Sequence, residues 1–249
     1  MTGYTVFLKD PLLPPLAPLD FMAKRLGGTA EAEKFLRANP CFLGRNLTLD
    51  AAKPLAEEAA SAGLPAVLAA EADLAALPRA WKPSKIAPAG TGFNADLSGI
   101  RTFVPYESVS LITAGAFDAL LPPVTLEPIR KDLLENVKKL AGMPVSRQTL
   151  PATRETFFRA EVITEKGELR LVLEQENLDY SGLGKEREQS SFLNFRKLLD
   201  ILAASALNAL KNPFLEAFLA GKPAAPFKLS SEQACETDTA RLLLLAPRR

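Results

Sequence analysis

One stretch, Thr156 to Leu210, constrains the fold more than any other part of the chain, because it holds the longest continuous periodicity. Its first half predicts a hairpin of two strands, Thr156 to Thr164 and Glu168 to Glu174, in which apolar and charged residues alternate. This period of two is typical of a sheet with one buried and one mostly solvated face, so Arg159 and Glu161 are expected to face water. The glycine between the strands supplies the positive backbone angle that a short turn requires.

The second half of this stretch predicts a polar loop, Ser181 to Gln189, and then a long amphipathic helix that Ser190 or Ser191 can cap. Its apolar residues repeat at helical spacing: Phe192, Phe195, Leu198, Leu199, Ile201, Leu202, Ala206 and Leu210. Such a stripe must be buried against another element. The hairpin is the nearest sheet, so we expect the helix and the hairpin to share one core.

The composition of the 249 residues, with 47% hydrophobic and 24% charged residues, is that of a globular protein. A formal net charge of +1 gives no global electrostatic reason to expect nucleic acid or an anionic membrane as a partner. No stretch approaches the roughly 18 to 20 apolar residues that span a bilayer. Charged residues follow the N-terminus too soon for a signal-peptide core, so we expect a cytoplasmic protein.

The sequence contains no histidine and only two cysteines, Cys41 and Cys235. A chain without imidazole cannot build a Ser-His-Asp or Cys-His nucleophile system, and it lacks the commonest transition-metal ligand. Neither cysteine belongs to a metal-type or redox-type spacing, which favours free thiols in a reducing compartment. No glycine-rich phosphate loop is recognisable either. We therefore expect a protein that is not an enzyme and holds no cofactor or metal.

Residues 1–75 predict a small βααβαβ module, in which glycines and prolines end the helices. The expected strands are Tyr4 to Lys9, Cys41 to Leu49 and Leu64 to Ala70, and the expected helices are Leu19 to Leu26, a helix from Thr29 that stops at Asn39, and Ala51 to Ala62, capped by Asp50. This order resembles the C-terminal domain of the bacterial ribosomal stalk protein. TVFLK at Thr5 to Lys9 and GTAEAEKFL at Gly28 to Leu36 are similar to its first strand and its second helix, and TLDAAKPLAEEAASAGLPAVL resembles its last helix and strand.

In the stalk family, a basic and apolar surface on the first two helices recruits translation factors. Lys24 falls among the family's basic positions, whereas Glu33 stands where the family has a lysine. The resemblance thus leaves two roles open, binding of translation factors or reuse of the module as a scaffold for another interaction. The residues expected to rim the partner-binding surface are Lys24, Arg25, Lys34 and Arg37.

Residues 76–98 are rich in proline and are interpreted as a linker or an edge between modules. Residues 99–249 are predicted to form a partly closed antiparallel barrel, or a sheet, with packed helices. A strand from Ile100 to Val104, the corner VPYESV and an apolar strand from Val109 that ends by Gly115 are similar to bacterial pleckstrin-homology-like barrels, which a helix closes at one end. The two resemblances together indicate a bacterial protein.

Two further segments of this second module carry apolar residues. Thr125 is expected to cap an inserted helix, residues 125–142, which packs on the barrel or meets another molecule. Near the C-terminus, Leu242 to Leu245 predict a last edge strand or a hydrophobic anchor for a partner. We favour the docked strand.

A different class of function would use polar residues around the start of the long helix. Carboxylates that follow the hairpin could bind a hard cation or act as an acid and base pair, although such a cluster is more often a solvated sheet edge. Nearby arginines could hold an anion. The residues of this alternative ligand site are Glu174, Asp179, Tyr180 and Arg196.

The sequence therefore predicts an α+β protein whose favoured function is a noncatalytic interaction or adaptor role. Its expected partner is another protein, not a membrane or nucleic acid, and a homo-oligomer stays open. The alternative is a barrel that binds a small ligand or acts as an enzyme through the cluster from Glu174 to Arg196. A deep pocket at that cluster would favour the alternative, whereas a shallow apolar patch would favour docking.

Overall fold

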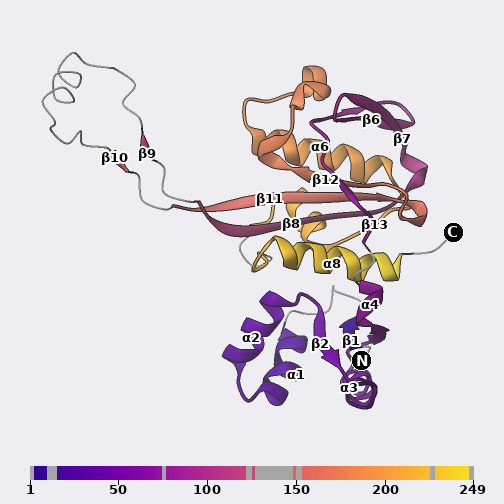
Figure 1. The fold of residues 1–249 in the computed structure, drawn as a ribbon, viewed down its shortest axis with the longest axis vertical. Helices are drawn as coiled ribbons and strands as arrows, with labels where there is room; N and C mark the ends of the chain where they lie inside the picture. The colour runs from indigo at the N-terminus through magenta and orange to yellow at the C-terminus, as the bar shows by residue number, and fades with distance from the viewer. Residues whose placement is uncertain are drawn as a thin grey trace, which may run out of the picture. The chain divides into compact units, whose positions relative to one another are not determined.

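A computed structural model describes residues 3–9, 16–74, 77–121, 125–126, 148–149, 153–224 and 228–246. The chain divides into two compact units, residues 1–117 with 157–249, and residues 118–156. The fold is α+β, as the sequence predicts, with helices packed on antiparallel and mixed sheets (Figure 1). None of the sheets formed by the described residues closes into a barrel, so a sheet with packed helices is the correct form of the second module.

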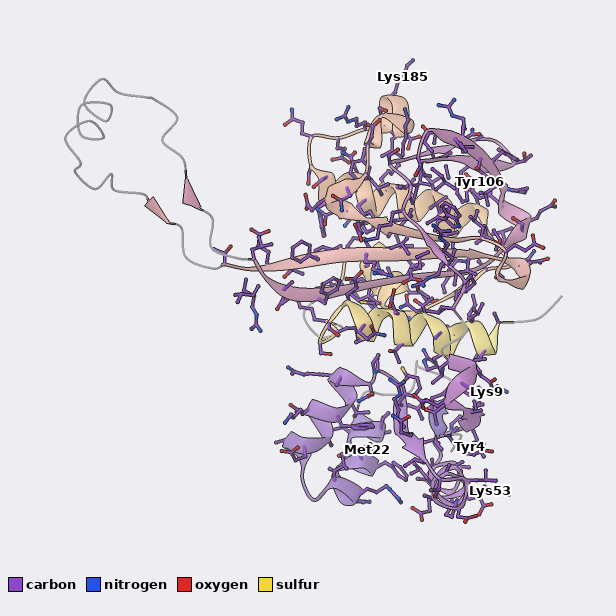
Figure 2. All side chains as sticks on the ribbon, viewed as in Figure 1. Tyr4, Lys9, Met22, Lys53, Tyr106 and Lys185 are labelled. Carbon is purple, nitrogen blue, oxygen red and sulfur yellow. The ribbon has the colours of Figure 1, made fainter. Side chains whose placement is uncertain are left out.

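The first module has the expected βααβαβ order. Its elements are β1 (Tyr4–Leu8), α1 (Leu16–Leu26), α2 (Thr29–Ala38), β2 (Phe42–Leu47), α3 (Leu49–Ser61) and β3 (Ala66–Ala70), followed by α4 (Glu71–Leu74). β1 lies in the middle of the sheet and is antiparallel to both neighbours. Val6 and Leu8 pack against the helices, where Figure 2 labels Met22 of α1. Thr48, not Asp50, precedes α3, and Asp50 lies in its first turn, where a carboxylate favours the helix dipole.

The segment interpreted as a linker or an edge, residues 76–98, contains strands. They are β4 (Ala80–Trp81), β5 (Lys85–Pro88) and β6 (Gly92–Leu97), of which β4 and β5 lie at the edges of their sheets. β5, β6 and β7 (Ile100–Pro105) form an antiparallel sheet in that order. Pro88 is compatible with a strand because it ends the edge strand β5, where the missing N–H does not interrupt the sheet.

A second sheet of five strands lies at the centre of the second module. Its order is β13 (Leu210–Lys211), β8 (Val109–Leu121), β11 (Thr153–Thr164), β12 (Arg170–Glu174) and β4. Short helical turns connect the strands and helices: η1 (Tyr106–Ser108), η2 (Glu165–Gly167), η3 (Gln175–Asn177) and η4 (Tyr180–Glu186). Gly115 lies inside β8 and does not end it. A Cβ at this position would lie 2.8 Å from Sγ of Cys235, so the glycine allows α8 to approach the strand closely.

The long helix predicted after the hairpin is α6 (Ser191–Ser205), and the Ser190 side chain accepts a hydrogen bond from the Leu193 N–H, as expected for a cap. Its stripe is buried together with the hairpin, so the predicted shared core is confirmed. Leu210, predicted as the end of the stripe, lies beyond the helix in β13. Two more helices follow, α7 (Pro213–Leu219) and α8 (Glu232–Leu245).

The four consecutive leucines near the C-terminus belong to α8, so the predicted edge strand is wrong. Successive residues of a helix point about 100° apart, and four leucines in a row therefore cover every side of it. A helix that is apolar all round is buried on more than one side. Leu242 packs with Leu111 of the five-stranded sheet, whereas Leu244 packs near Phe7 of β1. Thus α8 separates two cores.

The smaller unit contributes two short strands, β9 (Thr125–Leu126) and β10 (Gln148–Thr149), which pair antiparallel. The first two residues of the predicted helical insertion 125–142 are therefore strand. Residues 127–147, which hold the rest of that prediction, lie outside the described residues.

Candidate functional site

An open groove of about 340 Å³ lies beside β7. It is lined by Thr102, Phe103, Val104, Pro105, Ser108, Thr164, Glu165, Glu168 and Leu169. One wall is β7 with η1, where Figure 2 labels Tyr106, and the other is the turn that joins β11 to β12. None of these residues comes from β6, so the groove lies on the side of β7 that faces away from its sheet partner.

The main chain of β7 is open on this side. In the pairing of β6 with β7, Gly92 lies opposite Pro105, so the next pair along is Thr91 and Tyr106. The Tyr106 N–H donates to the carbonyl of Thr91 over 3.1 Å, so this is a hydrogen-bonded pair. In an antiparallel pair, hydrogen-bonded residues alternate with residues whose main-chain groups point outward. Arg101 and Phe103 therefore direct their N–H and C=O groups away from β6. No described strand pairs with that edge.

The open edge also carries apolar side chains. Ile100 is 70% exposed and Phe103 is 48% exposed. Phe103 is nevertheless held in place, because its ring covers Gly92, where a Cβ would lie 2.6 Å from Cζ of Phe103. An exposed edge strand with apolar side chains is a template for pairing with another chain, and proteins usually protect such an edge. This edge therefore has the properties of a docking site.

The opposite wall of the groove is a fixed turn. The Thr164 N–H donates to the carbonyl of Leu169 over 3.0 Å, and the Leu169 N–H donates to Oγ1 of Thr164 over 3.1 Å. Gly167, inside the turn, has a φ of 68°, in the left-handed region that favours glycine. The groove is thus preformed between a strand edge and a closed turn.

The charge of the groove is negative. Glu165 and Glu168 are the charged residues among those that line it. Neither carboxylate takes part in an ion pair with a side chain that the structure describes. They are available to a cation brought by a partner.

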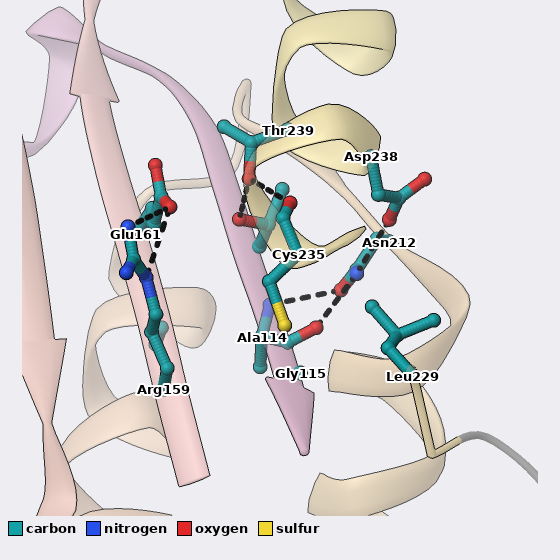
Figure 3. A pocket seen from close by; sticks show the side chains of 11 residues that line it. Ala114, Gly115, Arg159, Glu161, Asn212, Leu229, Cys235, Asp238 and Thr239 are labelled. Carbon is teal, nitrogen blue, oxygen red and sulfur yellow. Dashed lines mark hydrogen bonds and ion pairs between the residues drawn. The ribbon is translucent and has the colours of Figure 1, made fainter. Parts of the chain in front are cut away.

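A second concentration of charge lies between the hairpin and α8 (Figure 3). Arg159 and Glu161 were expected on a solvated face, yet they are only 4% and 2% exposed, and Arg170 on the second strand of the hairpin is 5% exposed. Glu161 accepts from Arg159 and from Arg170, each at 2.7 Å. Glu236 of α8 accepts from both arginines at 3.0 Å, and Glu232 pairs with Arg159. The polar face is therefore covered by a helix of complementary charge and not by water.

A cavity of about 10 Å³ remains within this layer, which is room for about one water molecule. Asn212 donates to the carbonyl of Ala114 over 2.8 Å, and Thr113 shares a hydrogen bond of 3.0 Å with Thr239. Among the described residues, no buried side-chain nitrogen or oxygen lacks a hydrogen-bond partner. The layer has the character of a satisfied structural network, because it offers a ligand neither space nor an unpaired group.

Both cysteines are free, as expected, and Cys235 lies on the buried side of α8. Burial raises the pKa of the Cys235 thiol from about 9.0 to about 12. Above about pH 9 the unfolded thiol loses its proton while the folded thiol keeps it. Deprotonation therefore favours the unfolded state, so the stability that the protonated Cys235 thiol contributes is complete below pH 9 and is lost as the pH rises toward 12.

Cys235→Ala is therefore expected to reduce the loss of stability at alkaline pH. Between pH 8 and 10.5, the free energy of unfolding should fall by about 2 kcal/mol less in the variant than in the wild type. Urea denaturation at the two pH values measures this difference, and any constant cost of the lost sulfur cancels. An identical fall in both proteins would contradict the assignment.

The predicted partner-binding residues lie on the first module. Lys24 and Arg25 are exposed in the last turn of α1, and Lys34 and Arg37 are exposed on α2. Arg25 pairs with Glu58 of α3. Because α1 and α2 are joined by two residues, the first pair lies near the start of α2 and the second lies toward its end. Partner binding at these two separate groups stays a prediction.

Three of the four alternative ligand residues are engaged elsewhere. Glu174 pairs with Lys82, Asp179 accepts from Ser181, and the Tyr180 hydroxyl donates to the carbonyl of Gln175. No hydrogen bond or ion pair within the described ranges joins any two of Glu174, Asp179, Tyr180 and Arg196, and none of the four lines either cavity. Burial opposes ionisation of Glu174, but its hydrogen bond from Lys82 lowers the pKa below the usual value. An ionised, paired carboxylate is poorly suited to act as a general acid.

Reasoning from the sequence missed both the groove and the buried charged layer. The sequence placed Ile100 and Phe103 in a predicted strand, but it does not show that they are exposed or that one edge of the strand is open, because both depend on which neighbours the strand has in the fold. For the charged layer, the sequence held one indication. Glu232 and Glu236 stand four residues apart, as two carboxylates on one face of a helix do.

Within the ranges that the structure describes, no helix is long and apolar enough to cross a membrane, and no group of three potential metal ligands gathers at one place. Comparison of the chain with protein families, with curated proteins and with solved structures finds no match.

Proposed function

We propose that this protein is a noncatalytic interaction protein that binds an extended segment of another protein along the free edge of β7. The open main chain of Arg101 and Phe103, beside a preformed groove, is the observation that carries the proposal. When a peptide adds to a sheet edge, main-chain hydrogen bonds supply affinity, and pockets for alternate side chains supply specificity. β7 and its groove contain both parts.

The chemistry of the groove supports a protein partner over nucleic acid. A phosphate backbone would meet Glu165 and Glu168, and its binding requires positive charge at the contact surface. The apolar side chains of Ile100 and Phe103 add surface that an extended peptide can cover. The free thiols are consistent with a reducing, cytoplasmic setting.

The proposal is tested by closing the edge with proline. Arg101→Pro removes an N–H that points away from β6, so the intramolecular sheet is retained while the partner loses a hydrogen-bond donor and meets a bulky ring. The probe is a fluorescein-labelled octapeptide of alternating valine and threonine with one lysine at its centre. Fluorescence anisotropy should show binding to the wild type and a loss of at least tenfold in affinity for the variant.

Arg101→Ala is the matched control, because it removes the same ion pair with Asp96 but keeps the main-chain N–H. It should bind the octapeptide within about twofold of the wild type, since exposed ion pairs contribute little. Equal binding by the proline variant, or no binding of the octapeptide to the wild type, would overturn the proposal.

A further inference from the structure

The groove beside β7 has a feature that strand addition alone does not use, which is the negative charge of Glu165 and Glu168. No side chain that the structure describes forms an ion pair with either carboxylate. Glu165 and Glu168 stand on the turn, across the groove from the free edge of β7. A strand laid along this edge alternates its side chains between two faces. The turn bounds the groove on the side opposite β7, so a strand held on the free edge of β7 lies between that edge and the two carboxylates, within reach of its side chains.

The remaining surface of the groove favours a long cationic side chain at that position. Leu169, which is half-buried, supplies apolar surface that can contact an aliphatic stem. The two carboxylates stand beyond it and can receive a charged end group, which is how lysine and arginine side chains extend along apolar surface toward water. A carboxylate or a phosphate at the same place would be repelled.

We infer that the segment recognised by this groove is an extended strand that carries a basic residue between apolar neighbours. This inference rests on the proposed function and names the chemistry of its partner. Glu165 and Glu168 select the basic residue, and the free edge of β7 holds the strand.

A second copy of this protein does not meet this description. Its own β7 edge has one basic residue, Arg101, and that guanidinium is already paired with Asp96. Pairing of two β7 edges would also bring two sets of Glu165 and Glu168 toward one interface, where like charges are unfavourable. Charge complementarity therefore points to a different, basic protein segment.

The inference is tested with two octapeptides that differ at one position. Both have the alternating valine and threonine sequence, and the central residue is lysine in one and the uncharged norleucine in the other. The wild type should bind the lysine peptide about three- to tenfold more tightly at low ionic strength, the effect expected of one cation near two partly exposed carboxylates. Salt should reduce this preference, because exposed charges are screened over about 10 Å at 0.1 M.

The variant Glu165→Gln/Glu168→Gln should bind both peptides equally, with the affinity of the wild type for the norleucine peptide. Glu107→Gln is the control, because Glu107 is exposed on η1 beside the groove but does not line it. That variant should keep the preference. The affinities of the wild type and of Glu165→Gln/Glu168→Gln for the two peptides form a double-mutant cycle. This cycle isolates the coupling between the lysine and the two carboxylates.

The outcomes separate this inference from the proposed function. If Arg101→Pro abolishes binding but the wild type binds both peptides equally, strand addition stands and selection of a basic residue is overturned. The same holds if the double variant keeps the preference for lysine. If neither peptide binds, or if sedimentation shows a dimer that Arg101→Pro dissociates, the groove serves another occupant and both proposals fail.

Discussion

Replacement of Glu161 by glutamine is expected to lower the free energy of unfolding by about 3–5 kcal/mol. The carboxylate is 2% exposed and accepts hydrogen bonds from two buried guanidinium groups, those of Arg159 and Arg170. The amide has nearly the same shape but no charge, so both arginines would keep their desolvation cost and lose their fully buried counter-ion, while the more exposed Glu232 and Glu236 stay in place. Urea denaturation at neutral pH measures the change.

An apolar replacement of the whole group separates burial of charge from loss of volume. In the variant Arg159→Met/Glu161→Leu/Arg170→Met/Glu236→Gln, the half-buried carboxylate that both arginines contact is neutralised as well. No buried or half-buried ion of this group then stays unpaired, and the stability should return to within about 1 kcal/mol of the wild type or exceed it. Arg25→Met serves as the exposed control, because its pair with Glu58 is solvated and should contribute less than about 1 kcal/mol. A loss below 1 kcal/mol for Glu161→Gln would show that this layer is solvated in the native protein.

Arg241→Met is expected to have an effect of similar size, about 3–5 kcal/mol, but in a different part of the molecule. Arg241 is fully buried in α8, donates to Asp238 at 2.7 and 3.1 Å, and donates to the main-chain carbonyl of Leu8 at 3.2 Å. The variant would leave a buried carboxylate with Asn212 as its remaining partner and a buried carbonyl without this donor.

Hydrogen exchange distinguishes this effect from a general loss of stability. Because the lost bond ends on β1, amides of β1 and β2 should exchange faster in Arg241→Met than in Glu161→Gln at matched global stability. Amides of α6, whose core does not include Arg241, should exchange alike in the two variants. Equal protection of β1 in both variants would contradict a specific role of Arg241 in holding the first module against α8.

Local signals were enough for much of the secondary structure. Glycine after α1, proline after α2 and the serine before α6 marked helix ends, because these residues act through their own backbone or the adjacent turn. The two candidate sites could not be found in this way. The groove depends on β7 pairing with one strand, β6, and not with a second strand on its other edge. Which strands pair is determined by the packing of residues that are distant in the sequence.

The sequence by itself determined the α+β class, the order of the first module and the shared core of hairpin and long helix, since periodicity shows which face of an element is apolar. Only the tertiary structure decided what covers each face. A period of two in Arg159 and Glu161 looks the same whether water or α8 lies opposite, because complementary charges can replace solvent. Leu242 to Leu245 likewise belong to a helix whose leucines pack against apolar residues on two sides. A local sequence pattern cannot show that apolar surface is present on both sides.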